Sequence, residues 1–223
     1  MEINSSFKLS LLETLKGFVN FTENPGNTES VFEIQKGLAG NPISLRCVEY
    51  MMSQPELRAL AEEMYQPTRP SLDILVKYNP DSLAHQYAKS LLDAGFDPDF
   101  YEVIEIEGPG TYLDLRARQT HDIWHVMTGF GTDLGGELGL QAFQLIQIYT
   151  PLSVLLMSSG LLHGESLGAD LEPLLHAIQE GFRIGHTTTP LLSVKWEEHW
   201  EKPVVLLREE LGLKTAEYTP FAN

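Results

Sequence analysis

One stretch of the sequence gathers the residue types that bind metal ions. His121 and Asp122 are followed by His125 and, after eleven further residues, by Glu137. Residues four apart on a helix lie on the same face, about 5–6 Å apart at their Cβ atoms, so the two imidazoles can bind one ion. A break at Gly129–Gly131 would let the chain reverse and return Glu137 on the next helix. Two imidazoles with one or two carboxylates suit Zn²⁺ first, with Fe²⁺, Mn²⁺ and Mg²⁺ as alternatives.

Asp122 follows His121 directly and therefore points about 100° around the helix from it. From there its carboxylate could bind the same ion, act beside it as a catalytic base, or hold one histidine in place. The spacing also allows a plain structural interpretation, in which Asp122 is a surface acid and Glu137 a first-turn anion favoured by the helix dipole. No other histidine has a partner at ligand spacing, so structural roles are expected for His85, His163, His176, His186 and His199.

Helices are the elements that must position these residues. Apolar residues recur at helical spacing, and proline stands repeatedly where helices begin. Because no repeat or composition shift divides the chain, residues 1–223 are predicted to form one all-α domain, a multi-helix bundle with the metal site between two consecutive helices. The predicted helical segments are 7–21, 28–39, 43–52, 55–64, 80–93, 112–128, 170–182 and 193–211, with two consecutive buried helices within 138–164.

Local signals mark several ends of these helices. Thr28 is expected to cap the second segment, and Asp133 the helix that carries Glu137. Pro151 is expected to open a helix, and Gly95 to end one. Residues 96–110 are the exception to the helical pattern and are predicted to form an extended piece or a short helix.

The charge of the chain excludes some classes of partner. Fifteen Lys and Arg against thirty-one Asp and Glu give a net charge of −16, which argues against nucleic acid because phosphate binding needs a positive field. The same charge disfavours anionic lipid, so peripheral membrane contact would have to be apolar. The single Cys47 cannot form an internal disulfide, which favours a reducing compartment.

No targeting signal is evident at the start of the chain, where neither an apolar signal core nor an Arg-rich amphipathic segment occurs. The segment Leu138–Gly164 contains no Asp, Glu, Lys or Arg, but glutamines, Pro151 and small residues interrupt it, so it is not expected to span a bilayer. The residues therefore predict a cytoplasmic protein without a membrane-spanning helix, and association with the inner face of a membrane is an expectation from the family resemblance described below.

The metal-ligand pattern also resembles that of a known family. His-Asp-x-x-His at 121–125, followed by eleven residues and Glu137, resembles the signature of the coenzyme Q biosynthesis protein 4 family. The likeness extends over about residues 66–215, with Ala84 standing where the family has glycine. The further matching positions are Arg118, Gly136, Pro151, Gly185, Pro80–Leu83 with Tyr87, Trp196–Glu201 and Leu206–Gly212.

The resemblance implies an all-α, homodimeric protein at a membrane surface that binds polyprenylated quinone precursors beside other quinone-biosynthesis proteins. The family is linked to removal of the ring carboxylate from a prenylated hydroxybenzoate, with hydroxylation at the same carbon. By this resemblance, His121, Asp122, His125 and Glu137 are metal ligands or lie next to them. The mitochondrial members carry an import presequence that is absent here, so the chain resembles a bacterial member.

The sequence also predicts a lipid-binding site next to the metal site. Arg118, one turn before His121, could pair with an anionic head group, or equally with Asp114 four residues earlier. Apolar side chains after Glu137 could line a pocket for an isoprenoid tail, or could simply form the core. These side chains are Leu145, Ile148, Leu152, Leu155 and Leu156.

Three functions remain open from the sequence. The first is a metal-dependent oxidative decarboxylase of a prenylated aromatic acid, with Asp122 as the catalytic residue. The second is a non-catalytic scaffold that binds prenyl lipids and organises other quinone-biosynthesis enzymes. The third is an all-α phosphohydrolase that uses adjacent His and Asp, which ranks last because a second, distant His and Asp pair is not evident.

Overall fold

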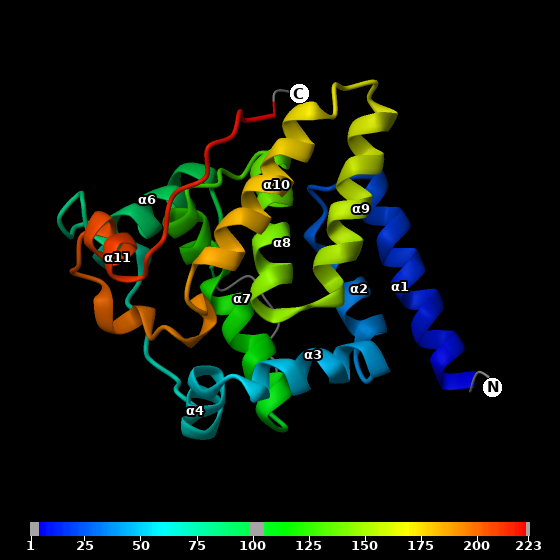
Figure 1. Ribbon diagram of the computed structural model, residues 1–223, viewed down its shortest axis with the longest axis horizontal. Coiled ribbons are helices and arrows are strands. Elements are labelled where there is room, and N and C mark those ends of the chain that lie inside the picture. The colour runs from blue at the N-terminus through cyan, green and yellow to red at the C-terminus, as the bar shows by residue number, and fades with distance from the viewer. Residues whose placement is uncertain (1–4, 99–104, 222–223) are drawn as a thin grey trace. The chain divides into compact units, whose positions relative to one another are not determined.

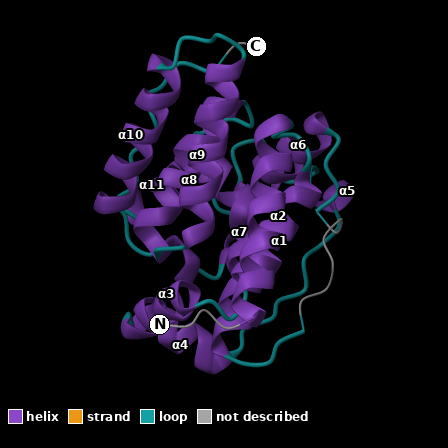
Figure 2. Ribbon diagram, turned by 90° about the vertical axis from the view of Figure 1, so that its right-hand side faces the viewer, coloured by secondary structure: helices purple, strands orange, loops and turns teal. Residues whose placement is uncertain are grey.

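The computed structural model describes residues 5–98 and 105–221. Within these ranges the regular structure consists of eleven α-helices and two short 3-10 helices, without a β-strand (Figure 2). An isolated backbone bridge joins Ser82 and Pro203. The predicted all-α class is therefore confirmed.

The chain folds into two compact units, each built from separate stretches of sequence. The first unit contains residues 1–50, 131–186 and 216–223, and the second contains residues 51–130 and 187–215. Helix α3, which runs from Pro42 to Ser53, crosses the boundary along the chain.

The first unit is a set of long helices. Its helices are α1 (Ser5–Glu23), α2 (Thr28–Leu38), most of α3, α8 (Leu134–Ile148), α9 (Pro151–Ser166) and α10 (Glu172–Thr187). Helix α1 packs against α2 and α9, and α8 packs against α9 (Figure 1). Helices α8 and α10 approach closely at Gly181, where a Cβ atom would lie 2.0 Å from the carbonyl oxygen of Gly139. Only glycine allows this approach.

Two apolar clusters fill the first unit. One contains Leu138 and Ala142 of α8 with Met157 and Leu174, and the other contains Ile34 of α2. Pro151 begins α9 as predicted. Proline suits this position because the N–H of a first helical residue has no partner within the helix, so its absence costs nothing. Helices α8 and α9 thus confirm the two consecutive helices within 138–164, and no described helix is both long and apolar enough to cross a bilayer.

The second unit consists of shorter helices around α7. They are α4 (Pro55–Glu63), α5 (Leu72–Leu75), α6 (Leu83–Ala94), α7 (Pro109–Thr128), the 3-10 helices η1 (Leu191–Ser193) and η2 (Trp196–His199), and α11 (Val204–Glu210). Arg116 of α7 and Glu197 of η2 form a buried ion pair, with two hydrogen bonds of 2.8 and 3.2 Å. Arg208 of α11 donates to the carbonyl oxygens of Val126 and Met127, which lie in the last turn of α7.

One predicted helix is wrong. Residues 193–211 do not form a continuous helix: η1 ends at Ser193, η2 covers Trp196–His199 and α11 begins at Val204, with residues 200–203 between the last two. The backbone of residues 200–203 instead forms hydrogen bonds with the start of α6. The Leu83 N–H donates to the Lys202 carbonyl oxygen, and the Ala84 N–H donates to the Trp200 carbonyl oxygen. Pro203, which has no N–H to continue a preceding helix, is the N-cap residue of α11.

Other helix ends differ from the predictions by a few residues. Asn27, and not Thr28, caps α2, because its side chain accepts from the Glu29 N–H. Ser82 caps α6, so this helix starts at Leu83, and Gly95 ends it in the left-handed conformation as predicted. Helix α7 begins three residues before the predicted segment 112–128, α10 continues to Thr187, and α5 was not predicted. Within 96–110, residues 99–104 lie outside the described residues.

Candidate metal centre

Helix α7 places the two predicted histidines one turn apart. The Nε2 atoms of His121 and His125 are 3.3 Å from each other, and the ring planes meet at 86° with centroids 4.9 Å apart. His121 is half-buried and the His125 side chain is buried, with 8% of the residue exposed. Both Nε2 atoms therefore face the same small volume beside the helix.

A backbone carbonyl orients the His125 ring. Helix α7 ends at Gly129, whose φ of 82° turns the chain so that the Phe130 carbonyl oxygen lies 3.1 Å from His125 Nδ1. A carbonyl oxygen can only accept a hydrogen bond, so Nδ1 carries the proton of the neutral ring. The Nε2 atom then keeps its lone pair, as metal-binding histidines require.

The start of α8 positions Glu137. Asp133 caps this helix as predicted, since its carboxylate accepts from the N–H groups of Gly135 and Gly136. Glu137, which is half-buried in the first turn, donates its own N–H to the Asp133 carbonyl at 2.9 Å. A Cβ atom on Gly136 would lie 2.1 Å from the Gly131 carbonyl oxygen, so the residue before Glu137 must be glycine.

Two of the four predicted ligands lie together on one helix. His121 and His125 of α7 bring their Nε2 atoms to 3.3 Å from each other, and Glu137 stands in the first turn of α8, in the other unit. Two imidazole nitrogens and one carboxylate oxygen form a donor set that suits a divalent transition metal, so the residues fit a metal ion. Asp122, which follows His121 on α7, is half-buried.

The residues predicted for a lipid site lie in other surroundings. Arg118 is half-buried, and its charge partly offsets a rise in the pKa of Asp114 that desolvation causes. Leu152, Leu155 and Leu156 pack in the apolar cluster around Ile34 of α2. Their contacts are thus core contacts of the first unit, and the lipid-binding role of these residues stays a prediction.

Sequence reasoning missed the segment that follows α11. Residues 214–221 contain no helix, yet the Tyr218 hydroxyl donates to Asp133 Oδ2 at 2.8 Å and accepts from the Gly131 N–H at 2.8 Å. The cap signal at Asp133 was readable in the sequence. Nothing local to Tyr218 indicated that this side chain would meet a turn 85 residues earlier.

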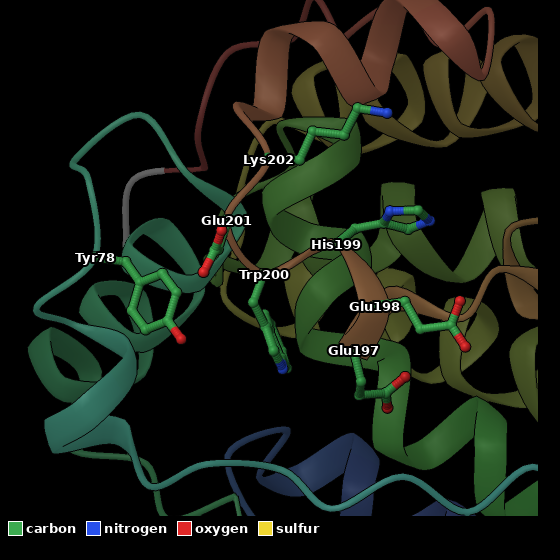
Figure 3. A pocket seen from close by; sticks show the side chains of 7 residues that line it. All are labelled: Tyr78, Glu197, Glu198, His199, Trp200, Glu201 and Lys202. Carbon is green, nitrogen blue, oxygen red and sulfur yellow. The ribbon is translucent and has the colours of Figure 1, made fainter.

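A separate hollow lies in the second unit and contains none of the predicted site residues. It has a volume of about 440 Å³ and is lined by Tyr78 and Glu197–Lys202 (Figure 3). Of its acidic groups, Glu197 is neutralised by Arg116. The residues that line the hollow are thus different from His121, His125 and Glu137.

Together these features define a class: all-α proteins with two histidines one helical turn apart on one helix and a glutamate in the first turn of the next helix. Within this class, the chain belongs to the family described as coenzyme Q (ubiquinone) biosynthesis protein Coq4, whose family model matches residues 4–217. The resemblance drawn from the sequence is thereby confirmed.

Relatives from yeasts and from a bacterium match along most of the chain. The ubiquinone biosynthesis protein COQ4, mitochondrial, of Lachancea thermotolerans is 29% identical over 204 residues, and that of Yarrowia lipolytica is 30% identical over 185 residues. These matches cover 85% and 74% of this chain, but only 59% and 64% of the two yeast proteins. A crystal structure from Nostoc punctiforme PCC 73102, described as a candidate ubiquinone biosynthesis protein, has 32% identity and a TM-score of 0.83, with 92% of this chain and 97% of that chain covered.

Proposed function

We propose that this chain acts in ubiquinone biosynthesis as a metal-dependent enzyme that removes the ring carboxylate of a polyprenylated aromatic acid. In this proposal His121, His125 and Glu137 hold a divalent metal ion. The observation that carries it is the pair of Nε2 atoms 3.3 Å apart on α7, in a chain whose relatives are named for ubiquinone biosynthesis.

The distance between the two nitrogens would allow one ion to bind both. Two ligands at a Zn–N length of about 2.0–2.1 Å lie at most about 4 Å apart, and the Nε2 atoms are 3.3 Å apart. Because two imidazoles and a carboxylate are ordinary zinc ligands, zinc is the first candidate.

A divalent ion at these ligands would supply a Lewis acid for the phenolate and carboxylate of the substrate. Asp122 is half-buried next to His121 in sequence, and we assign it the proton transfer to or from the ring. Arg118, one turn earlier, would pair with the anionic head group, because a guanidinium matches a carboxylate with two hydrogen bonds.

The complete reaction proposed here replaces the ring carboxyl group by a hydroxyl group. Carbon dioxide leaves and one oxygen atom of dioxygen enters the ring, while the other becomes water with two electrons and two protons from an external donor. Zinc exchanges no electrons, whereas iron(II) bound to two histidines and one carboxylate occurs in oxygenases. A zinc ion would therefore support decarboxylation alone, whereas an iron ion would also support the hydroxylation.

The proposal extends to the lipid tail and to the place of action. We assign the isoprenoid tail to α8 and α9, on the side of Leu152, Leu155 and Leu156, in a homodimer at the inner face of a membrane. Support comes from α9, which carries no charged residue before Glu165 and exposes Val154 and Leu162. An apolar surface of this kind suits a prenyl chain better than it suits water.

Metal analysis and turnover on the purified protein test the proposal. Wild-type protein should hold close to one equivalent of a divalent metal and should release CO₂ from a prenylated hydroxybenzoate. His125→Ala should lose both properties and keep its helical circular dichroism. His186→Ala is the matched control, since this exposed histidine also bonds a carbonyl through Nδ1 but lies on α10. Tightly held metal without CO₂ release from any prenylated hydroxybenzoate would contradict the enzyme and favour the lipid-binding scaffold.

A further inference from the structure

The segment after α11 holds the turn that leads into α8. Its Tyr218 hydroxyl lies between the Gly131 N–H and Asp133 Oδ2, with both distances at 2.8 Å. Three residues later, the Phe221 N–H donates to Asp133 Oδ1, also at 2.8 Å. In Figure 1 this red segment runs beside α10, and the Phe221 contact brings it to the N-terminal end of α8.

Asp133 links this segment to Glu137. Its side chain accepts from the segment and from the first N–H groups of α8, while its carbonyl oxygen accepts the Glu137 N–H. The Tyr218 hydroxyl oxygen also lies 2.7 Å from the point where a Cβ atom of Gly136 would be. The hydroxyl is therefore packed directly against the residue that precedes Glu137.

The turn needs such support because of its composition. Glycine occupies positions 131, 135 and 136, and glycine loses more backbone freedom on ordering than any other residue. The segment itself is anchored at two further points: the Glu217 N–H donates to Glu180 of α10 at 3.0 Å, and Phe221 packs in the Leu138 cluster.

We propose that Tyr218 is a positioning residue for Glu137, and that residues 216–221 form a strap that keeps this carboxylate in place for the metal ion. The inference rests on the proposed function, because it gives Glu137 the role of a ligand. Tyr218 acts through Asp133 and the α8 backbone, without itself binding the ion.

The chemistry of the tyrosine agrees with this role. Desolvation, assisted by the bond to the Asp133 carboxylate, raises the pKa of Tyr218 to about 12. The hydroxyl therefore keeps its proton at neutral pH and remains a donor to Asp133. Groups that hydrogen-bond a metal ligand directly change metal affinity about 10–100-fold when they are removed. Tyr218 acts one step further away, through Asp133, so its effect should be smaller.

Tyr218→Phe tests the strap, because it removes only the hydroxyl. The readout is the dissociation constant for zinc, measured by competition with a chromogenic chelator, together with the melting temperature of the metal-free protein. We expect the dissociation constant for zinc to rise by about 3–10-fold, less than for the loss of a direct partner of a ligand. We expect the melting temperature of the metal-free variant to fall by only a few degrees, as for loss of about one hydrogen bond. Tyr78→Phe, in the second unit, is the control and should leave the dissociation constant unchanged.

Asp133→Asn is the second variant, since asparagine keeps the cap of α8 but offers an amide N–H₂ where Tyr218 needs an acceptor. Asp133→Asn should also raise the dissociation constant for zinc. It keeps the strap testable if Tyr218→Phe does not fold. Unchanged zinc affinity in either folded variant would overturn the strap while leaving the metal site intact. A wild-type protein that binds no metal would overturn the proposed function, and the strap with it.

Discussion

Glu197→Gln should destabilise the protein by about 3–5 kcal/mol, because it leaves the Arg116 guanidinium buried without its counter-charge. The side chains of Arg116 and Glu197 are 1% and 9% exposed, so water cannot replace the lost partner. Arginine cannot lose its proton to escape the penalty. Of its described acceptors, only the Gln119 side chain at 3.1 Å would be unchanged, and Arg116 Nε already has no partner.

The size of this effect can be measured by thermal and urea unfolding of wild type and variant. At about 2–4 °C per kcal/mol for a chain of this length, the melting temperature should fall by roughly 6–20 °C. Glu63→Gln is the control, since it removes the acid of an exposed ion pair with Lys195 in the same unit. Such pairs contribute about 0–1 kcal/mol, so this variant should melt close to wild type.

A double variant separates the charge from the packing. Arg116→Met with Glu197→Leu removes both charges and should recover most of the lost stability, because two apolar side chains need no partner. A cost for Glu197→Gln as small as that of Glu63→Gln would refute the reasoning, since the pair would then behave like a surface ion pair.

Three further changes have expected outcomes. Pro151→Ala should shift the melting temperature by only a few degrees, because the residue begins α9, and a large fall would contradict that boundary. Gly136→Ala should lower both stability and metal content, because its Cβ would lie 2.1 Å from the Gly131 carbonyl oxygen; normal metal content would count against this contact. Arg183 lowers the pKa of Glu180 below its ordinary 4.5, so this acid stabilises the fold above pH 4.5 and the contribution disappears as the pH falls through the lowered value. Urea unfolding of Glu180→Gln between pH 3 and 7 should therefore show a smaller loss of stability in acid than wild type.

The parts of the fold that sequence reasoning predicted depend on neighbouring residues. Asp133 as a cap, Gly129 as a left-handed helix end and Pro151 as a helix start each act within one turn of their own position. The same holds for His121 and His125, because the helix alone brings residues four apart together. Short-range rules were sufficient at these positions.

The parts that were missed depend on residues far along the chain. Helical periodicity over 193–211 was overruled by backbone pairing with residues 81–84, more than a hundred positions earlier. Tyr218 carries no motif of its own, and its contact with Asp133 becomes visible only in the folded chain. The sequence alone left three roles open for Asp122 for a related reason, since the neighbours of a residue in sequence do not determine what its side chain contacts.

The interleaved order of the first unit has a consequence for how it is made. Its helices come from residues before 51 and after 130, whereas Ala216–Phe221 are synthesised only after all of them. At about 5–20 residues per second, the ribosome adds Tyr218 roughly 4–17 s after Asp133, since 85 residues separate the two. During this interval the turn before Glu137 lacks the hydrogen bonds from Tyr218 and Phe221. A nascent chain stalled before residue 216 should therefore have a lower affinity for zinc than the released protein. Tight metal binding then becomes possible only at the end of synthesis.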